Sequence, residues 1–343
     1  METPPPPLRE SGRAVVVGGG IAGATAARAL QKRGLLVTVL DKGRGVGGRL
    51  STRRSDAGAF DHGAQCFTAR SLPFVDAVGE WAQAEAARRW VGRFAELDGD
   101  GLRVLPDRNL WVGIPGMSRI VAHQLDGLDI RFGSEARGVV RSAQGWSVET
   151  ASGDRLGPFE HAVVAVPAPQ AAVLLGAAAP TLAESARAVR FAPCWSVMAA
   201  FASTLSLPFD GLSVLSGSPL ERVSRDGSKP ARDAGPPERW VLHAGPDWSR
   251  ANIDLEPEEA GELLVRAFLG LVTDLRGAAS APSYVCAHSW RYARPLESLE
   301  TPCLHDPAIS LAVCGDWCLG PRVEDAWTSG VAAASALLGS DAG

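Results

Sequence analysis

The stretch Ala14-Val15-Val16-Val17-Gly18-Gly19-Gly20-Ile21-Ala22-Gly23 decides the fold of this chain. Its apolar run predicts a buried strand, which passes directly into glycines spaced as Gly-x-Gly-x-x-Gly. We expect Gly18 to permit a tight turn, Gly20 to let the backbone approach a pyrophosphate, and Gly23 to let the next helix pack closely on the strand. The free N–H groups at the start of that helix would bind the phosphates.

A second apolar run, Leu35 to Leu40, follows the helix and ends at Asp41. Asp41 lies 18 positions after Gly23, close to the spacing of about 20 expected for the acid that binds a ribose hydroxyl. The alternative is a glycine-rich turn in another kind of parallel α/β sheet, which needs neither this spacing nor the acid. The pattern therefore predicts the strand, turn, helix and strand of a dinucleotide site.

A loop rich in glycine and arginine, from Gly43 to Arg54, comes next. Gly47 and Gly48 would let the backbone pass close to a bulky ligand, while the guanidinium of Arg49 would face phosphate or ring oxygens. The alternative is a solvated basic loop, which suits Arg53 and Arg54. We interpret this loop as a sign of a flavin protein rather than a simple nicotinamide dehydrogenase.

Composition and charge argue against several classes of function. The chain has 343 residues, of which 46% are hydrophobic, enough for two domains or one large α/β unit with a sizeable core. Its formal net charge of −4 argues against general binding to nucleic acid or to a membrane surface. No uninterrupted apolar run of about 18 residues occurs, so we expect no transmembrane helix.

The N-terminal residues and the cysteines suggest a compartment. Residues 1–12 contain four consecutive prolines and lack the pattern of a signal peptide, so we expect an extended, disordered leader. The six cysteines are scattered through the chain, and Cys314 and Cys318 fit small buried side chains better than a zinc site. We therefore expect a cytoplasmic protein without a metal ion.

The rest of the chain alternates helix and strand signals. We predict helices over 24–33, 72–83, 118–125, 256–273 and 327–338, and strands over 92–104 (a pair), 128–134, 138–150, 162–166, 191–201, 212–215, 239–244 and 309–314. Ser118 is the expected N-cap of its helix. The strands between 191 and 244 together predict an antiparallel sheet that covers the cofactor.

Several polar or aromatic residues have two interpretations. The stretch 222–237 is charged and rich in glycine and proline, so we expect a flexible surface loop. We favour a solvated Lys229 over one that contacts a substrate phosphate. His243, on an apolar strand, fits a core histidine better than a catalytic base. Trp195 is the tryptophan best placed to reach a cavity wall.

Two segments carry a resemblance to a known family, residues 41–49 (DKGRGVGGR) and 60–70 (FDHGAQCFTAR). Further matches are Trp111 to Met117, Ser228-Lys229-Pro230, Leu242-His243-Ala244, Trp248-Ser249-Arg250, Tyr292 to Pro295 and Cys314 to Cys318. Together they resemble the bacterial renalases, FAD-dependent oxidases within the larger group of amine-oxidase-like flavoproteins. Cys66 departs from the family, which usually has a tyrosine there, and Ser289 and Arg291 alter the stretch before Tyr292.

The resemblance implies FAD as the cofactor and an α/β fold whose topology is like that of p-hydroxybenzoate hydroxylase. A discontinuous Rossmann-type FAD-binding domain would comprise residues 13–72, 128–172 and 300–343. A second, α+β substrate domain, built on the antiparallel sheet, would comprise 73–127 and 173–299. The implied cofactor-binding residues are Gly18, Gly20, Ile21, Ala22, Gly23, Asp41, Lys42, Gly48, Arg49, Gln65, Ala136, Gly315, Asp316 and Val323.

The same resemblance implies an oxidase that takes hydride from the 2- or 6-dihydro isomers of β-NAD(P). NAD(P)⁺ would leave, and molecular oxygen would reoxidise the flavin with release of hydrogen peroxide. The implied substrate walls are Gln65, Cys66, Phe67, Thr68, Ala69, Asp107, Arg108, Asn109, Cys194 and Trp195. No catalytic side chain is implied, because the flavin carries the chemistry and the ring nitrogen of a dihydropyridine assists departure of the hydride.

Two alternatives stay open. A flavin-dependent oxidase of amines or other small metabolites would use an apolar or aromatic cage, which Cys66 in place of tyrosine weakens. A flavin-binding regulatory protein without turnover is also compatible with the motifs, although the second domain is larger than cofactor retention requires.

Overall fold

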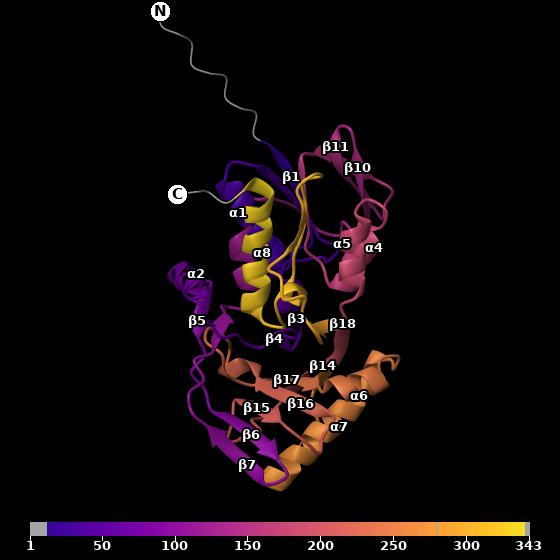
Figure 1. Cartoon of the computed structure of the whole chain (residues 1–343). Helices are drawn as coiled ribbons and strands as arrows, with labels where there is room; N and C mark the ends of the chain where they lie inside the picture. Colours follow the sequence, from indigo (N-terminus) through magenta and orange to yellow (C-terminus); the bar gives the residue numbers. More distant parts are fainter. Residues whose placement is uncertain (1–11, 279, 340–343) are drawn as a thin grey trace, which may run out of the picture.

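The computed structural model describes residues 12–278 and 280–339, so the leader expected for residues 1–12 lies outside the described residues except for Gly12. Two units lie one above the other in Figure 1. The upper unit contains both ends of the described chain. The lower unit is built on a long antiparallel sheet whose outer face is covered by a helix.

A six-stranded sheet forms the centre of the upper unit. Strand β1 pairs in parallel with β2 and β13, with Val16 opposite Val39 on one side and Val163 on the other. Strands β9 and β20 extend the sheet in parallel, and β19 closes one edge antiparallel. The order is β19 (Leu304–Asp306), β20 (Leu311–Val313), β13 (His161–Val164), β1 (Arg13–Val17), β2 (Leu36–Leu40) and β9 (Asp129–Arg131).

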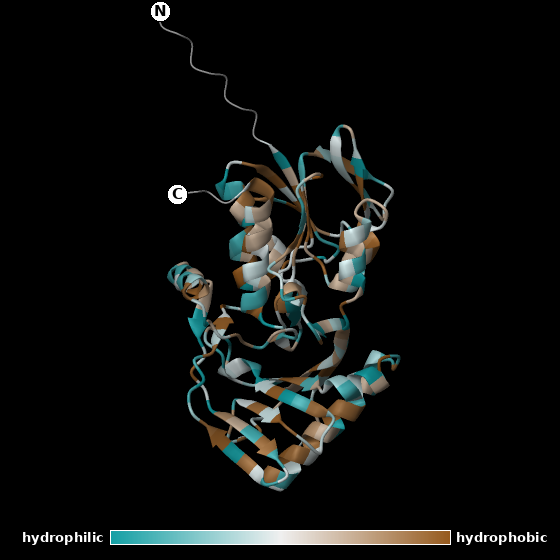
Figure 2. Cartoon of the chain, viewed as in Figure 1, coloured by the Kyte–Doolittle hydropathy of each residue, from teal (hydrophilic) through white to brown (hydrophobic). Residues whose placement is uncertain are grey.

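Both faces of this sheet are covered, which explains why its strands are almost continuously apolar. Val16 and Val39 face a cluster that contains α1 (Ile21–Lys32), α3 (Ser118–Leu125) and α8 (Val323–Leu338). Val15 and Val17 point the other way, towards α4 (Ala168–Leu175), α5 (Pro180–Arg187) and a sheet of β10 (Ala136–Ser142), β11 (Gly145–Thr150) and β12 (Arg155–Phe159). The alternation follows from the period of two in a strand. In Figure 2 the central strands run brown between helices of mixed colour.

The lower unit is a seven-stranded sheet. Of the strand pairs described within this sheet, β15 with β6 is parallel and the others are antiparallel. Its order is β18 (Tyr284–Pro295), β14 (Phe191–Phe201), β17 (Glu238–Ala244), β16 (Leu220–Arg225), β15 (Gly211–Val214), β6 (Phe94–Asp98) and β7 (Gly101–Leu105). The outer face packs on α7 (Pro257–Arg276), whose Leu264 and Phe268 lie in one cluster with Val197 and Trp240. Helix α6 (Pro246–Ala251) borders β14 (Figure 1).

Short elements join the two units. The hairpin of β3 (Thr52–Ser55) and β4 (Gly58–Asp61) places Phe60 against Met198 and Val241 of the lower sheet. Helix α2 (Leu72–Gln83) contacts β5 (Ala87–Arg89), which pairs with β8 (Trp111–Gly113). Three single-turn 3₁₀ helices complete the described elements: η1 (Gly48–Leu50), η2 (Asp226–Ser228) and η3 (Asp316–Cys318).

The predicted α/β class, with a Rossmann-type sheet and a second antiparallel sheet, is confirmed. Two local predictions are wrong. Met117, not Ser118, precedes α3, and the Ser118 N–H donates to Thr52 Oγ at 3.2 Å instead. The expected flexible loop begins inside β16, and Lys229 within it is 2% exposed. A sequence rich in charge, glycine and proline looks like a surface loop, but here its charges neutralise one another in the interior.

Two helices pack differently from the division of the chain that we expected. Helix α3 belongs to the stretch assigned to the substrate domain, yet Ile120 and Val121 pack in the cluster of α1, and the Arg28 guanidinium donates to the Gln124 carbonyl at 2.9 Å. Helix α5 likewise packs with α4. The sequence predicts a helix over 118–125 but not the sheet on which it packs, and the helix over 180–187 was not predicted. None of the helices in the described ranges combines the length and apolar character needed to cross a bilayer.

Candidate active site

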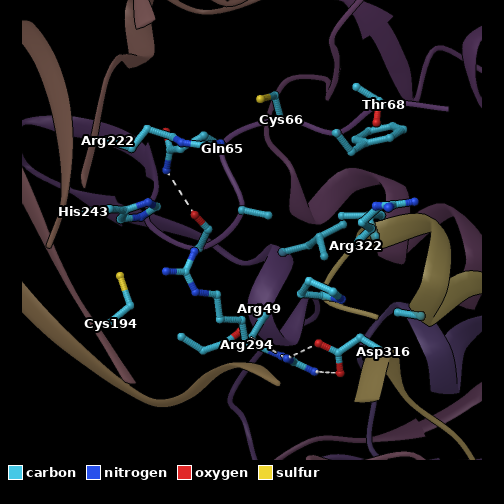
Figure 3. A pocket seen from close by; sticks show the side chains of 18 of the residues that line it. Arg49, Gln65, Cys66, Thr68, Cys194, Arg222, His243, Arg294, Asp316 and Arg322 are labelled. Carbon is cyan, nitrogen blue, oxygen red and sulfur yellow. Dashed lines mark hydrogen bonds and ion pairs between the residues drawn. The ribbon is translucent and has the colours of Figure 1, made fainter. Parts of the chain in front are cut away.

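A cavity of about 540 Å³ lies where the two units meet. The N-terminus of α1 borders one end, together with Arg49 and Asp316. The lower sheet borders the other end through four side chains, each on a different strand. These are Cys194, Arg222, His243 and Arg294, which are labelled in Figure 3. The segment from Gly63 to Thr68 runs along the wall between the two ends. The cavity therefore spans both units, as a site for a long cofactor and a second molecule requires.

The glycine turn has the geometry that its spacing predicts. Gly18 adopts a φ of +109°, and a Cβ added at Gly23 would lie 1.9 Å from the Gly18 carbonyl oxygen, so both positions require glycine. Gly20 lines the cavity, and a Cβ added there would meet no atom within 4 Å. It would project into open space at the start of α1, where no side chain caps the helix. These free N–H groups and the open space beside them fit a pyrophosphate.

Asp41 closes the far side of this turn. Its carboxylate accepts hydrogen bonds from the Gly19 and Gly43 N–H groups, both at 2.6 Å. A carboxylate has about four acceptor positions, so a ribose hydroxyl could bind beside these two donors. Among the other cofactor residues that we predicted, the cavity lining includes Ile21, Ala22, Gln65, Gly315 and Val323, but not Gly18, Gly23, Asp41, Lys42, Gly48 or Ala136.

Arg49 and Asp316 come from opposite ends of the chain and form a bidentate ion pair at 2.6 and 2.7 Å (Figure 3). Arg49 also donates to the Ala293 carbonyl at 3.2 Å. Both side chains border the cavity. The guanidinium that we expected to face ligand oxygens therefore braces the loop after β2 against the end of β20, and a two-pronged pair of this kind fixes the orientation of both groups.

The predicted substrate wall divides into two sets. Gln65, Cys66, Phe67, Thr68, Arg108 and Cys194 line the cavity, whereas Ala69, Asp107, Asn109 and Trp195 are not among its lining residues. Trp195 follows Cys194 on β14, and successive side chains on a strand point to opposite faces. Its ring is 2% exposed, and Nε1 donates to the Asn252 carbonyl at 2.9 Å. Asp107 instead pairs with Arg89 at 2.8 Å.

The Gln65 amide is held by its neighbours. Nε2 donates to the carbonyl oxygens of Asp61 and Gly63, the latter at 3.1 Å, and Oε1 accepts from Lys229 Nζ at 3.1 Å. Both amide hydrogens are therefore used within the protein. Gln65 shapes the wall, but its NH₂ group is not free to bind a substrate.

Several lining residues were not predicted, chiefly His243, Trp290, Arg222, Glu221 and Arg294. His243 Nε2 lies 3.3 Å from the His62 carbonyl oxygen, which also accepts from Trp290 Nε1 at 2.9 Å. A carbonyl only accepts, so His243 carries its proton on Nε2. Burial lowers the pKa of His243 to about 4, against the opposing effect of this hydrogen bond, so its ring is neutral at pH 7. Strand periodicity could have placed these side chains on one face, but not on the face that meets the cavity.

The two cavity thiols are unreactive. Burial raises the pKa of Cys194 to about 12, and the Glu221 carboxylate adds to the effect. Burial also raises the pKa of Cys66, although the guanidinium groups of Arg222 and Arg108 and the Lys229 ammonium oppose it. Because the thiolate is the nucleophile, neither cysteine is suited to covalent catalysis at neutral pH.

The charge of the cavity is strongly one-sided. Its lining includes six arginines but two carboxylates. Asp316 pairs with Arg49, and Glu221 pairs with Arg294 at 2.9 Å. Arg108 and Arg222 are both exposed, and neither side chain has a hydrogen bond or ion pair with another described residue. Both lower the pKa of Cys66, which places their charges at the same end of the cavity.

Comparisons with solved structures identify the same fold. A cyclohexylamine oxidase from Brevibacterium oxydans IH-35A superposes with a TM-score of 0.72 at 14% identity, covering 96% of this chain and 99% of that one. A putrescine oxidase, solved as the wild type bound to putrescine, gives a TM-score of 0.69 at 12% identity, covering 95% and 98%. An oxidoreductase from Methanosarcina mazei gives 0.68 at 14%, covering 93% and 99%.

Family comparisons cover most of the chain. Residues 16–78 match the NAD(P)-binding Rossmann-like domain, which agrees with the glycine turn and Asp41. Residues 97–338, well over half of the chain, match the family described as flavin containing amine oxidoreductase. The flavin is FAD, and the protein is a flavin-dependent oxidoreductase. The chain belongs to the flavin containing amine oxidoreductase family.

Proposed function

We propose that this protein is an FAD-dependent oxidase of the renalase type, which takes hydride from the 2- or 6-dihydro isomers of β-NAD(P) and releases NAD(P)⁺. The observation that carries the proposal is the pair of unpartnered arginines, Arg108 and Arg222, at the substrate end of the cavity. Two guanidinium groups without an acidic partner attract an anion and repel an ammonium ion. A dinucleotide substrate carries a pyrophosphate that matches them.

The chain's own residues bind and orient the donor. Arg108 and Arg222 hold the substrate pyrophosphate, while Cys66, Phe67 and Cys194 form an apolar wall for the dihydropyridine ring. The neutral His243 adds no charge that would oppose a ring becoming cationic. When bound, FAD would supply the acceptor for the hydride and would return the two electrons to oxygen, which leaves as hydrogen peroxide with one proton derived from the hydride and one from solvent. No side chain needs to act as a base, because the donor loses only hydride.

Oxidation of an amine is the second candidate, and one observation favours it. Trp90 and Phe94 line the cavity with ring centroids 4.9 Å apart and planes at 85°, as in an aromatic wall that could bind an alkyl ammonium. The cyclohexylamine and putrescine oxidases share the fold. The excess of arginine over carboxylate in the lining disfavours a cationic substrate.

Anaerobic reduction of the purified yellow holoenzyme distinguishes these functions. The donors are 6-dihydro-NAD, ordinary NADH, cyclohexylamine and putrescine, each followed by loss of the flavin absorbance in a stopped-flow instrument. We expect rapid bleaching by 6-dihydro-NAD and little change with the other three. Rapid bleaching by an amine alone would replace the proposal with the second candidate. Failure of all four donors, with FAD bound, would favour a flavin-binding protein without turnover.

A further inference from the structure

Four charged side chains meet in the interior directly behind the cavity wall. Lys229 Nζ lies 3.1 Å from Asp61 Oδ2 and 2.8 Å from Asp226 Oδ1, and the Arg232 guanidinium lies 2.6 Å from Asp61 Oδ2. The side chains of Lys229, Asp61 and Asp226 have no exposed surface, and that of Arg232 is 4% exposed. We call these four residues the buried ion cluster.

Within the buried ion cluster, Asp61 and Lys229 stay ionised. Burial opposes the charge of Asp61, but Lys229 and Arg232 outweigh it and lower the pKa of Asp61 to about 2. Burial likewise opposes the ammonium of Lys229, yet Asp226 and Asp61 raise its pKa above the usual value. The cluster contains two basic and two acidic side chains, so the numbers of the two kinds are equal. Lys229 is not among the lining residues of the cavity, so it does not reach a substrate phosphate.

Lys229 touches the backs of two wall residues. Its ammonium donates to Gln65 Oε1 at 3.1 Å and lies 5.6 Å from the centre of the Trp90 ring, whose Nε1 donates to Ser228 Oγ at 3.2 Å. Gln65 and Trp90 both line the cavity. The segment beside Gln65 is also tied to the cofactor side, because the Ala64 N–H donates to the Arg49 carbonyl at 2.9 Å.

We propose that Lys229 is a positioning residue: held by Asp61 and Asp226, it fixes the Gln65 amide and thereby sets the wall from Gly63 to Phe67 against FAD. Asp61 anchors the other end of this wall, because it accepts from the Met117 N–H at 2.9 Å and from Thr52 Oγ at 2.7 Å. The wall is therefore tied on one side to the β3–β4 hairpin and on the other side to the segment that follows β16. The inference rests on FAD binding and not on the identity of the donor.

Three variants separate positioning from charge balance. Asp226→Asn unbalances the cluster but keeps the Lys229–Gln65 hydrogen bond. Lys229→Met with Asp226→Asn removes one cation and one anion, so the remaining Asp61–Arg232 pair is neutral, and it deletes that hydrogen bond. Gln65→Leu deletes the hydrogen bond and leaves all four charges. Each holoenzyme is measured for Tm, for the visible absorption spectrum and reduction potential of its FAD, and for the limiting rate of anaerobic flavin reduction.

We expect the limiting rate of flavin reduction to depend on whether the Lys229–Gln65 contact is present and not on the Tm of the variant. The double variant regains a Tm near that of the wild type, whereas its limiting rate falls about tenfold to a hundredfold, as expected for a displaced wall. Its flavin spectrum and potential shift as those of Gln65→Leu do, and adding Gln65→Leu causes no further loss. The single variant Asp226→Asn has a lower Tm than the double variant, but its limiting rate of flavin reduction falls less.

A double variant with recovered Tm and a wild-type spectrum, potential and rate would overturn the inference, because Lys229 would then serve charge balance alone. The spectrum and potential require no substrate, so they test the inference even if every donor fails to reduce the flavin.

Discussion

The two ends of the cavity are built in different ways. At the cofactor end, backbone N–H groups of one contiguous stretch, Gly18 to Gly23, lie beside an arginine that is already paired with Asp316. At the substrate end, side chains from separate strands meet, and neither Arg108 nor Arg222 has an acidic partner among the described residues. The end that we propose binds FAD is therefore a preformed cradle, whereas the end that we propose binds the substrate carries unpaired positive charge that suits an anion. A site built from the backbone N–H groups of one contiguous stretch has a recognisable sequence motif. A site built from side chains on separate strands has none.

The largest effect should come from filling the cradle. Gly20→Val places a branched side chain in the open space that fits the pyrophosphate, so we expect the purified protein to lose its FAD. Absorbance at the flavin band after gel filtration measures the bound fraction. Gly79→Val in α2 is the matched control, since a Cβ there also meets no atom within 4 Å, but far from the glycine turn. Full FAD content in Gly20→Val would contradict the cradle.

Two neighbouring histidines, His62 and His243, should lower the stability of the fold in acid. Burial lowers the pKa of both His62 and His243 from 6.5 to about 4. Between pH 6.5 and 4 the unfolded state therefore binds protons that the folded state does not, so the free energy of unfolding falls as pH falls. Each histidine contributes a loss of about 3 kcal/mol across that range.

Chemical denaturation of the holoenzyme at several pH values measures this dependence. His62→Gln should reduce the slope of unfolding free energy against pH by about 1 kcal/mol per pH unit between pH 6 and 4.5, the contribution of one histidine with this shift. An unchanged slope would show that His62 titrates normally in the folded protein.

A smaller effect is expected at the edge of the cradle. Asp41→Ala removes one acceptor for the ribose and frees the Gly19 and Gly43 N–H groups. A hydrogen bond to a charged group contributes about 1.5–3 kcal/mol, so FAD should bind about tenfold to a hundredfold more weakly. Fluorescence titration of the apoprotein with FAD gives the dissociation constant. Unchanged affinity would mean that Asp41 serves only the turn.

The fold around the glycine turn could be predicted from the sequence because its information is local. The run from Ala14 to Gly23 contains a strand, a turn and a helix start in consecutive residues. The family resemblance also implied that Gly315 and Asp316 lie near the cofactor. The pairing of Asp316 with Arg49, 267 residues away in the chain, depends on the closing of the sheet and could not be read from either segment.

The lining at the opposite end of the cavity could be predicted less completely, because its side chains come from distant parts of the chain. Cys194 and Trp195 are adjacent in sequence, but the pleat of β14 directs one to the cavity and the other to the core. Lys229 was expected to be solvated, because its segment is charged and rich in glycine and proline. Its partner Asp61 lies 168 residues earlier, so their pairing could not be read from that segment. Arg222 and His243 reach the cavity only because β16 and β17 pair side by side.

The charge at the substrate end is tested most directly by comparing 6-dihydro-NAD with 6-dihydronicotinamide riboside, which lacks phosphate, in anaerobic flavin reduction. We predict that the wild type binds the dinucleotide about tenfold to a hundredfold more tightly, as expected for charge-assisted hydrogen bonds. Arg108→Gln with Arg222→Gln should abolish this preference while leaving the dissociation constant of the riboside unchanged. Equal affinity of the wild type for both donors, or a preference that survives in the double variant, would contradict the account.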